Sequence, residues 1–196
     1  MGSHQQQVSQ RTDRPTKTDG TPDAFCRVNY RLPTLLDRHH ELDAFVCRSV
    51  EQTHWLIRHA RQSMAAGNTR VFVTTPNDSD AVCAYYAWTM AHIDAANVPT
   101  RLLKGGGRYP QPVALLARLG VHTEHEGYGL GAGLLKDVIL RTAAISAQIG
   151  CRGLLVHAES ERARSFYKHL IPEFESSPTD ELHLVLMLKD IKKTLK

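Results

Sequence analysis

The chain has 196 residues, a formal net charge of +4 at pH 7 and a hydrophobic fraction of 42%. This length suits one globular domain, and the hydrophobic fraction is sufficient for a packed core. No stretch approaches the ~20 apolar residues of a membrane-spanning helix, and no charged start precedes an apolar run as in a signal peptide. The composition therefore excludes a membrane protein and favours a cytoplasmic protein that does not bind membranes.

The cysteines give no sign of a disulfide framework or a metal site. Cys26, Cys47, Cys83 and Cys151 are scattered along the chain without a C-x-x-C pair, and "HHE" at 39–41 is not part of an H-E-x-x-H motif. We therefore expect reduced thiols that serve as small hydrophobic side chains, and no metal.

Residues 1–24 are too polar to pack. "MGSHQQQ" resembles the remnant of an expression tag, and the chain from there to about Asp23 is dominated by Gln, Ser, Thr, Asp, Lys and Pro. Such a composition predicts a disordered tail, followed by a single domain over residues 25–196.

The first half of this domain predicts one helix and two strands. Leu56, Ala60 and Met64 recur every four residues, which predicts a helix from about 50 to 66 that stops at Gly67. "RVFVTT" and "AVCAYYAWTMAHI" predict two strands joined across the polar turn "PNDSD". Residues 94–111 are rich in Gly and Pro and predict a loop.

The second half predicts alternating strands and helices. "PVALLARLGVH" (112–122) predicts a strand, and a glycine loop follows it. A helix ending at Gly150 comes next, then the strand "CRGLLVHA" and a short helix "SERARSFYKHL" with Ser160 as its N-cap. "ELHLVLML" predicts the last strand and "KDIKKTLK" a basic tail. The fold class is therefore a mixed α/β domain.

The glycine loop "HEGYGLGAGLL" has the composition of a loop that binds a phosphorylated cofactor. A phosphate-binding Walker loop is excluded, because no G-x-x-x-x-G-K-[ST] occurs. "GYGLGA" does satisfy the dinucleotide pattern G-x-G-x-x-[GA]. However, the acidic Glu159 lies about thirty positions after the first glycine rather than roughly twenty, and too little chain follows for further Rossmann strands.

The same loop resembles that of the GCN5-related N-acetyltransferases (GNAT family), whose pattern is [QR]-x-x-G-x-[GA]. Gly129 and Gly131 match, and Glu126 stands where Gln or Arg is usual. "SERARSFY" is similar to the family's N-x-x-A-x-x-x-Y helix, in which Ala163 and Tyr167 match and Ser160 replaces Asn. The resemblance implies the GNAT acyl-CoA N-acyltransferase fold and acetyl-CoA as the cofactor.

The resemblance also implies roles for individual residues. Tyr167 would be the general acid that protonates the leaving thiolate, and a backbone N–H on the 118–122 strand would stabilise the oxyanion. Residues of the strand, the glycine loop and the Tyr167 helix would bind the cofactor: Leu119, Gly120, Val121, Glu126, Gly127, Tyr128, Gly129, Leu130, Gly131, Ala132, Ser160 and Ala163.

No residue stands out as a general base. His122, Glu124, His125 and His157 are all placed near strand ends, and none is favoured over the others. An acceptor amine that is already partly neutral needs less help from a base. This favours an α-amino group, with a pKa of about 7.7–8.0, over a lysine side chain with a pKa near 10.4.

The N-terminal half resembles the acetyltransferase toxins of bacterial type II toxin–antitoxin systems. The matches to that family's opening pattern are Phe45, Cys47, Trp55, Leu56, Ala60, Arg70 and Phe72. Val46 and Arg48 depart from the Asp and Gly often found there. The resemblance implies acetylation of the α-amino group of aminoacyl-tRNA, which blocks translation. It also implies a ribbon-helix-helix antitoxin that represses the operon together with the toxin on operator DNA, and a toxin homodimer.

Two segments rich in cations would suit a polyanionic acceptor. Residues 27–70 hold seven Arg and no Lys against four acidic residues, and Asp94 is the only acid between Ile93 and Arg118. From these segments we predict five contacts to tRNA phosphates: Arg58, Arg61, Arg101, Lys104 and Arg108. A solvated surface would give the same pattern. A protein N-terminus or small amine as acceptor, and a catalytically inert acetyl-CoA-binding regulator, also remain open.

Overall fold

The computed structural model describes residues 29–97, 99–104 and 109–194. The predicted tail, residues 1–24, and the predicted contact Arg108 lie outside this part of the chain. The strands are β1 (Thr34–Leu35), β2 (Arg70–Thr74), β3 (Ala84–Ile93), β4 (Gln111–Val121), β5 (Gly153–His157), β6 (Glu175–Ser176) and β7 (His183–Met187). The α-helices are α1 (Val50–Ala65), α2 (Thr100–Leu103), α3 (Leu130–Ile145), α4 (Glu161–Leu170) and α5 (Leu188–Thr194).

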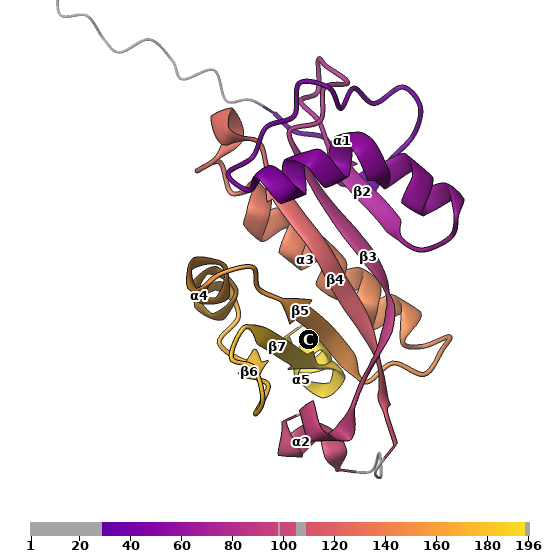
Figure 1. Cartoon of the computed structure of the whole chain (residues 1–196), viewed down its shortest axis with the longest axis vertical. Coiled ribbons are helices and arrows are strands. Elements are labelled where there is room, and N and C mark those ends of the chain that lie inside the picture. The colour runs from indigo at the N-terminus through magenta and orange to yellow at the C-terminus, as the bar shows by residue number, and fades with distance from the viewer. Residues whose placement is uncertain (1–28, 98, 105–108, 195–196) are drawn as a thin grey trace, which may run out of the picture.

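The described strands form one mixed sheet in the order β1-β2-β3-β4-β5-β7-β6 (Figure 1). Only β4 and β5 pair in parallel; the other neighbouring strands are antiparallel. A parallel pair needs a long crossover connection, and the glycine loop with α3 supplies it. The chain therefore has the mixed α/β fold that was expected from its sequence.

The strands β4 and β5 pair over a short length only. The paired residues run from Ala114 with Leu154 to Leu116 with Val156. Beyond Leu116, β4 continues to Val121 and pairs with β3 alone among the described strands. One edge of the last five residues of β4 thus has no strand partner, and the sheet opens there.

A β-bulge lies where this opening begins. The register between β3 and β4 shifts between Ala87 and Trp88, which face Arg118 and Leu116, so that Ala117 is the extra residue on β4. A bulge bends its strand and increases the local twist. The bulge therefore turns the end of β4 away from β5.

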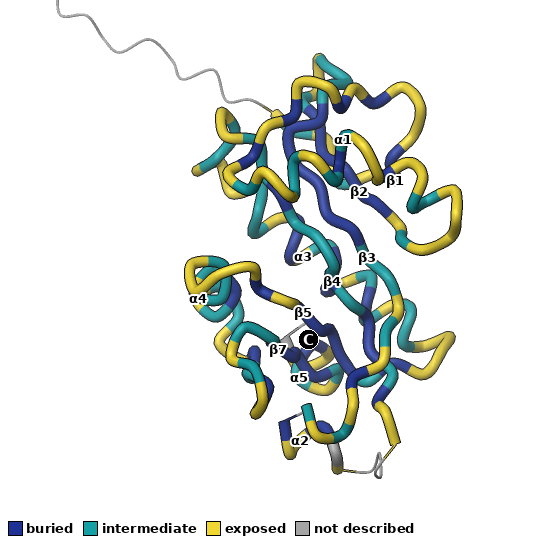
Figure 2. Tube along the Cα trace, in the orientation of Figure 1, coloured by how far each residue is buried: buried dark blue, intermediate teal, exposed yellow. Residues whose placement is uncertain are grey.

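Helices cover both faces of the sheet. One face packs against α3, α4 and α5 through residues such as Leu134, Tyr167 and Ile191. The other face packs against α1 through Leu56 and Ala60 and, further along, against α2. In Figure 1 α1 crosses in front of the sheet and α3 behind it, and in Figure 2 the buried chain runs through the strands between them.

Two predictions about local structure are wrong. Residues 94–111 are not only a loop, since they contain α2, which forms because Leu102 is buried at 2% exposed against Ile93 and Val113. "KDIKKTLK" is not only a basic tail, because Lys189–Thr194 lie in α5, where Ile191 is buried at 1% exposed in the core. Both helices are too short for a periodicity to be recognised in the sequence.

The helix predicted to end at Gly150 is also shorter than expected. It is α3, and it ends at Ile145, where the backbone N–H of Ser146 bonds the carbonyl of Thr142. Turns then lead to the strand β5.

None of the helices in the described part of the chain is both long enough and apolar enough to cross a membrane.

The packing of α3 predicts a difference between two leucines on the same helix. Leu134 is 1% exposed in the core, whereas Leu140 is 42% exposed. Leu134→Ala should lower the free energy of unfolding by about 2–5 kcal/mol, because it leaves a cavity. Leu140→Ala should change it by less than about 1 kcal/mol. Urea unfolding of both variants measures this difference, and equal losses would contradict the packing described here.

Candidate functional site

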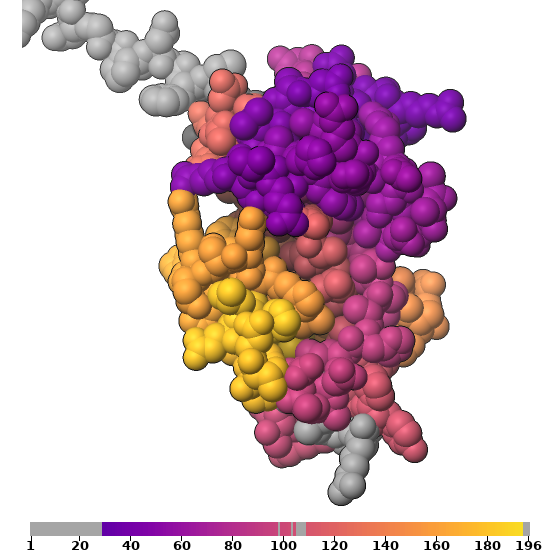
Figure 3. Space-filling view, in the orientation of Figure 1, coloured from indigo at the N-terminus to yellow at the C-terminus, as the bar shows by residue number. Residues whose placement is uncertain are grey.

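A cleft of about 810 Å³ lies where β4 and β5 diverge. The space-filling view shows the surface hollowed between the indigo N-terminal segment and the orange segment of α4 (Figure 3). The cleft is lined by four segments: residues 47–52 at the start of α1, the end of β4, the glycine loop, and α4 with the residues before it. These segments are far apart in the sequence, and the opening of the sheet brings them together.

The glycine loop has the backbone conformation of an anion-binding loop. Gly127 and Gly129 have φ of +82° and +81°, in the left-handed region that a side chain disfavours. Gly129 is the N-cap of α3, and no side chain caps that helix. The first N–H groups of α3 have no acceptor within the helix, and the helix dipole makes this end positive. The end of α3 can therefore bind a phosphate group.

Most of the loop residues predicted to bind the cofactor line the cleft. They are Glu126, Gly127, Gly129, Leu130, Gly131 and Ala132. Tyr128 does not line it and is 55% exposed, with its ring near that of Tyr30. At Gly131 a Cβ atom would lie 3.1 Å from Cζ of Phe166 on α4, so that glycine allows the loop to approach α4 closely.

The end of β4 forms one wall of the cleft through Leu119, Gly120 and Val121. A Cβ atom on Gly120 would lie 2.8 Å from Cε1 of Tyr85, so a larger residue would clash with that ring. Because this part of β4 has no partner on the β5 side, backbone groups are available there for a ligand. Such an edge suits the extended amide chain of pantetheine. Together with the loop, it fits coenzyme A.

Ser160 and Ala163 line the opposite wall, on α4. Ser160 is the N-cap of α4, as predicted, and its side-chain oxygen accepts a hydrogen bond from the backbone N–H of Ala163 at 3.3 Å. A hydroxyl that accepts one bond can still donate another. Ser160 can therefore cap the helix and bind a ligand at the same time.

Tyr167 lies one helical turn after Ala163 and is 7% exposed. Its ring meets those of Phe166 and Phe174 at centroid distances of 5.3 and 6.0 Å. Burial, and secondarily the negative charge of Glu159, raise the pKa of Tyr167 above its usual value. The phenol therefore keeps its proton at neutral pH. Tyr167 is not itself among the residues that line the cleft, but Ala163 and Phe166 of the same helix are.

The sequence did not single out the segment Cys47–Ser49 as part of the site. Arg48 donates from Nε to both carboxylate oxygens of Glu126 at 2.7 Å, and its Nη2 also contacts that carboxylate. Ser49 donates from its hydroxyl to Glu159 at 2.6 Å. The signal in the sequence was that both Arg48 and Glu126 depart from the pattern of the family, although nothing showed that they meet.

The candidate histidines have internal partners. Both ring nitrogens of His122 form hydrogen bonds: Nε2 bonds the carbonyl of Ala44, and Nδ1 accepts from the backbone N–H of Glu124. His125 lines the cleft and bonds the hydroxyl of Tyr30 at 2.9 Å, and burial with the nearby His122 lowers its pKa.

His157 stacks on His183 at 3.9 Å, and burial followed by the charge of His183 lowers the pKa of His157. Glu124 is exposed and does not line the cleft. Of the four candidates, only His125 therefore lines the cleft, and Nδ1 of its ring already bonds Tyr30.

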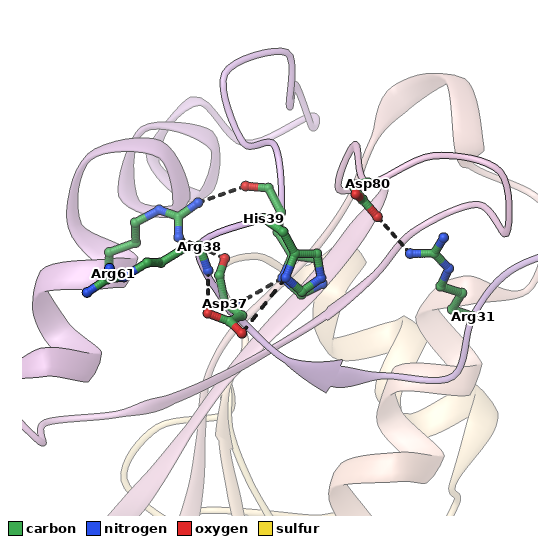
Figure 4. Close-up of polar contacts among 7 residues, drawn as sticks. Arg31, Asp37, Arg38, His39, Arg61 and Asp80 are labelled. Atoms are coloured by element: carbon green, nitrogen blue, oxygen red, sulfur yellow. Dashed lines mark hydrogen bonds and ion pairs between the residues drawn. The ribbon is translucent and has the colours of Figure 1, made fainter.

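The predicted tRNA contacts do not form one surface. Arg58 and Arg61 lie on α1, and Arg101 and Lys104 lie at α2, near the opposite end of the molecule (Figure 1). Figure 4 shows Arg61 among the residues of the preceding loop; it donates to the carbonyls of Asp37 and His40 at 2.8 and 2.7 Å.

The other predicted contacts differ in their partners. Arg101 pairs with Glu175 and Asp190. Arg58 and Lys104 are exposed, and their charged groups have no partner within the described residues. Of the four predicted contacts that lie within the described residues, Arg58 and Lys104 are therefore the two that are free to bind phosphate.

Comparison with known proteins finds relatives over most of the chain. The chain is 35% identical over 163 residues to the tRNA-acetylating toxin of Mycobacterium tuberculosis (strain ATCC 25618 / H37Rv), which covers 83% of this chain and 95% of that protein. It is 26% identical over 162 residues to the probable toxin TacT of Sinorhizobium fredii (strain NBRC 101917 / NGR234), covering 80% and 90% of the two chains. No protein-family model matches.

Solved structures of toxins share the fold. AtaT complexed with acetyl-methionyl-tRNAfMet matches with a TM-score of 0.77 at 22% identity, covering 86% of this chain and 100% of that one. An AtaT variant bound to acetyl-CoA and the C-terminus of the antitoxin AtaR matches with a TM-score of 0.71 at 22% identity, covering 85% of this chain and 97% of that one. The AtaT–AtaR complex bound to DNA matches with a TM-score of 0.67 at 21% sequence identity, covering 85% of this chain and 100% of that one.

The loop geometry predicts opposite effects at two glycines. Gly129→Ala places a side chain at a φ of +81° and should lower the free energy of unfolding by about 1–2 kcal/mol. Gly133 lies within α3, where a Cβ atom would meet nothing within 4 Å. Gly133→Ala should stabilise the fold by about 0.4–1 kcal/mol. Thermal and urea unfolding compare the two, and a stabilising Gly129→Ala would contradict the left-handed loop.

Proposed function

The chain belongs to the family of tRNA-acetylating toxins, and from this we propose that it transfers the acetyl group of acetyl-CoA to the α-amino group of aminoacyl-tRNA, which blocks translation. The observation that carries the proposal is the 35% identity to the Mycobacterium tuberculosis toxin over 95% of that protein. Charged tRNA is in the cytoplasm, so the protein acts there. Residues 25–196 act as one acetyltransferase domain.

The cleft supports acetyl-CoA as the cofactor. The N-terminal end of α3 and the N–H groups around Gly129 bind the pyrophosphate, and the free edge of β4 beside Leu119 and Val121 binds the pantetheine arm. When bound, the cofactor supplies the acetyl group as a thioester. An AtaT structure that contains acetyl-CoA has the same fold.

Two groups of this chain act on the reacting atoms. A backbone N–H at the end of β4 donates to the acetyl oxygen as negative charge develops there. The phenol of Tyr167 holds its proton at neutral pH, since the ordinary pKa of tyrosine is near 10, and this is the form that can protonate a leaving thiolate. Ala163 lines the cleft one turn before Tyr167 on the same helix, so a cofactor that contacts Ala163 lies close to the turn that carries the phenol.

Of the four candidate bases, only His125 lines the cleft, and its lowered pKa supports an acceptor amine that needs little help from a base, such as an α-amino group. Such an amine has a pKa of about 7.7–8.0 and is partly neutral at cellular pH, whereas a lysine side chain is almost fully protonated. AtaT has been captured with acetyl-methionyl-tRNAfMet, the product of such an acetylation. The acceptor is therefore an aminoacyl-tRNA rather than a lysine.

The partners follow from the same relatives. AtaT binds the C-terminus of the antitoxin AtaR, and the AtaT–AtaR complex binds DNA. We propose a ribbon-helix-helix antitoxin for this chain, which covers the cleft and binds operator DNA together with it. A homodimer of the chain is part of this proposal, and light scattering of the purified protein tests it.

Tyr167→Phe tests the catalytic assignment. Removing the hydroxyl should lower the rate of acetylation of charged tRNA by about 10²–10⁴-fold and relieve growth arrest on expression. Binding of CoA, measured by calorimetry, should stay within about threefold of the original protein, because the substitution removes a single hydroxyl and keeps the ring in the core.

Tyr109→Phe is the matched control, since Tyr109 is 80% exposed and lies outside the cleft. It should retain full activity. A Tyr167→Phe variant that stays fully active and toxic would show that another group protonates the thiolate.

Arg58 and Arg61 should respond differently to replacement by Gln. Arg58→Gln should weaken tRNA binding and reduce the slope of log K against log salt by about one, with no loss of stability. Arg61→Gln should lower the free energy of unfolding by about 1–3 kcal/mol, because it loses two hydrogen bonds from a charged group to carbonyls. Filter binding at several salt concentrations and urea unfolding measure the two effects. Equal effects on tRNA binding and on stability would contradict the distinction.

A further inference from the structure

Arg48 and Glu126 form an ion pair across the mouth of the cleft. They lie 78 positions apart in the sequence, and the guanidinium contacts both carboxylate oxygens. Both residues line the cleft. Arg48 lies in the segment before α1, and Glu126 lies directly before Gly127 of the anion-binding loop.

The backbone on both sides of Arg48 is fixed. Cys47 forms an isolated antiparallel bridge with His122, and the N–H of Thr123 bonds the carbonyl of Val46 at 2.9 Å. On the other side, Ser49 caps α1 by accepting from the N–H of Gln52. The backbone of this segment therefore holds Arg48 beside the glycine loop, within reach of Glu126.

The position of Glu126 has an electrostatic cost for a phosphorylated ligand. The N–H groups of the loop and the end of α3 attract an anion, and a carboxylate directly before Gly127 repels it. A guanidinium bound to both oxygens of that carboxylate cancels the repulsion. Among the arginines and glutamates that line the cleft, Arg48 and Arg162 balance Glu126 and Glu159. Loss of Arg48 would leave this set with a net charge of −1.

We propose that Arg48 is a cofactor-binding residue, which neutralises Glu126 so that the glycine loop can accept the pyrophosphate of coenzyme A. This inference rests on the proposed function, since it takes acetyl-CoA as the ligand of the cleft. Arg48 acts through charge, so its importance depends on the presence of Glu126.

Four proteins test this dependence: the full chain and its variants Arg48→Gln, Glu126→Gln and the double variant. Calorimetry with CoA at low salt should show binding roughly tenfold weaker for Arg48→Gln, the size of one partly screened charge interaction. Glu126→Gln should bind CoA as well as the original protein or better. The double variant should recover to within about threefold of the original protein, because the repulsive carboxylate is gone.

Salt and a shorter ligand separate charge neutralisation from other causes. The defect of Arg48→Gln should shrink as salt rises from about 0.05 to about 0.5 M, because screening weakens the repulsion. Dephospho-CoA keeps the pyrophosphate and lacks the 3′-phosphate, and its binding should be weakened by the same factor. A defect that vanishes with dephospho-CoA would overturn the assignment to the pyrophosphate.

Two variants control for folding and for charge in general. Arg48→Lys keeps the positive charge and should bind CoA within about threefold of the original protein. Arg31→Gln removes an arginine from an ion pair with Asp80 outside the cleft (Figure 4) and should leave CoA binding unchanged.

The outcomes distinguish this inference from the proposed function. If the original chain does not bind CoA, the proposed function itself fails. If the original chain binds CoA and Arg48→Gln binds equally well, only the role of Arg48 fails. If Arg48→Gln is equally harmful with and without Glu126, Arg48 does not act by neutralising that carboxylate.

Discussion

The candidate site depends on the separation of β4 from β5 after only three paired residues. The bulge at Ala117 bends β4 at that point, and the remaining residues to Val121 keep hydrogen bonds to β3 alone among the described strands. Backbone groups that a continuous sheet would use are then available for an extended ligand. The same opening exposes the N-terminal end of α3 and one wall of α4 to the cleft. Without it, the glycine loop would have a helix end but no space for the rest of a cofactor.

Charge at the mouth of this cleft is balanced rather than strongly positive. Glu126 would oppose the attraction of the α3 dipole for a phosphate, and Arg48 binds Glu126 through both carboxylate oxygens. Ser49, the next residue, bonds Glu159 on the far wall. One short segment before α1 therefore contacts both sides of the cleft. This arrangement joins the N-terminal half, which carries the resemblance to the toxins, to the half that carries the glycine loop.

The sequence predicted the features that depend on local patterns. The mixed α/β fold, the position of α4 and the capping role of Ser160 are confirmed, because periodicity and capping are encoded within a few residues. The helices α2 and α5 were missed because they have only 4 and 7 residues, and the buried Leu102 and Ile191 do not by themselves make a periodic pattern. The pair of Arg48 with Glu126 could not be predicted, since it depends on how two distant segments meet. The same holds for the partners of Arg61.

The central claim is that the α-amino group of an aminoacyl-tRNA is the acceptor. Labelled acetyl-CoA incubated with the protein and total charged tRNA tests it most directly, with deacylated tRNA and a small polyamine as competing acceptors. We expect label on charged tRNA alone, released by mild alkaline hydrolysis as an N-acetylated amino acid. Equal labelling of deacylated tRNA, or label found only on the polyamine or on protein N-termini, would contradict it.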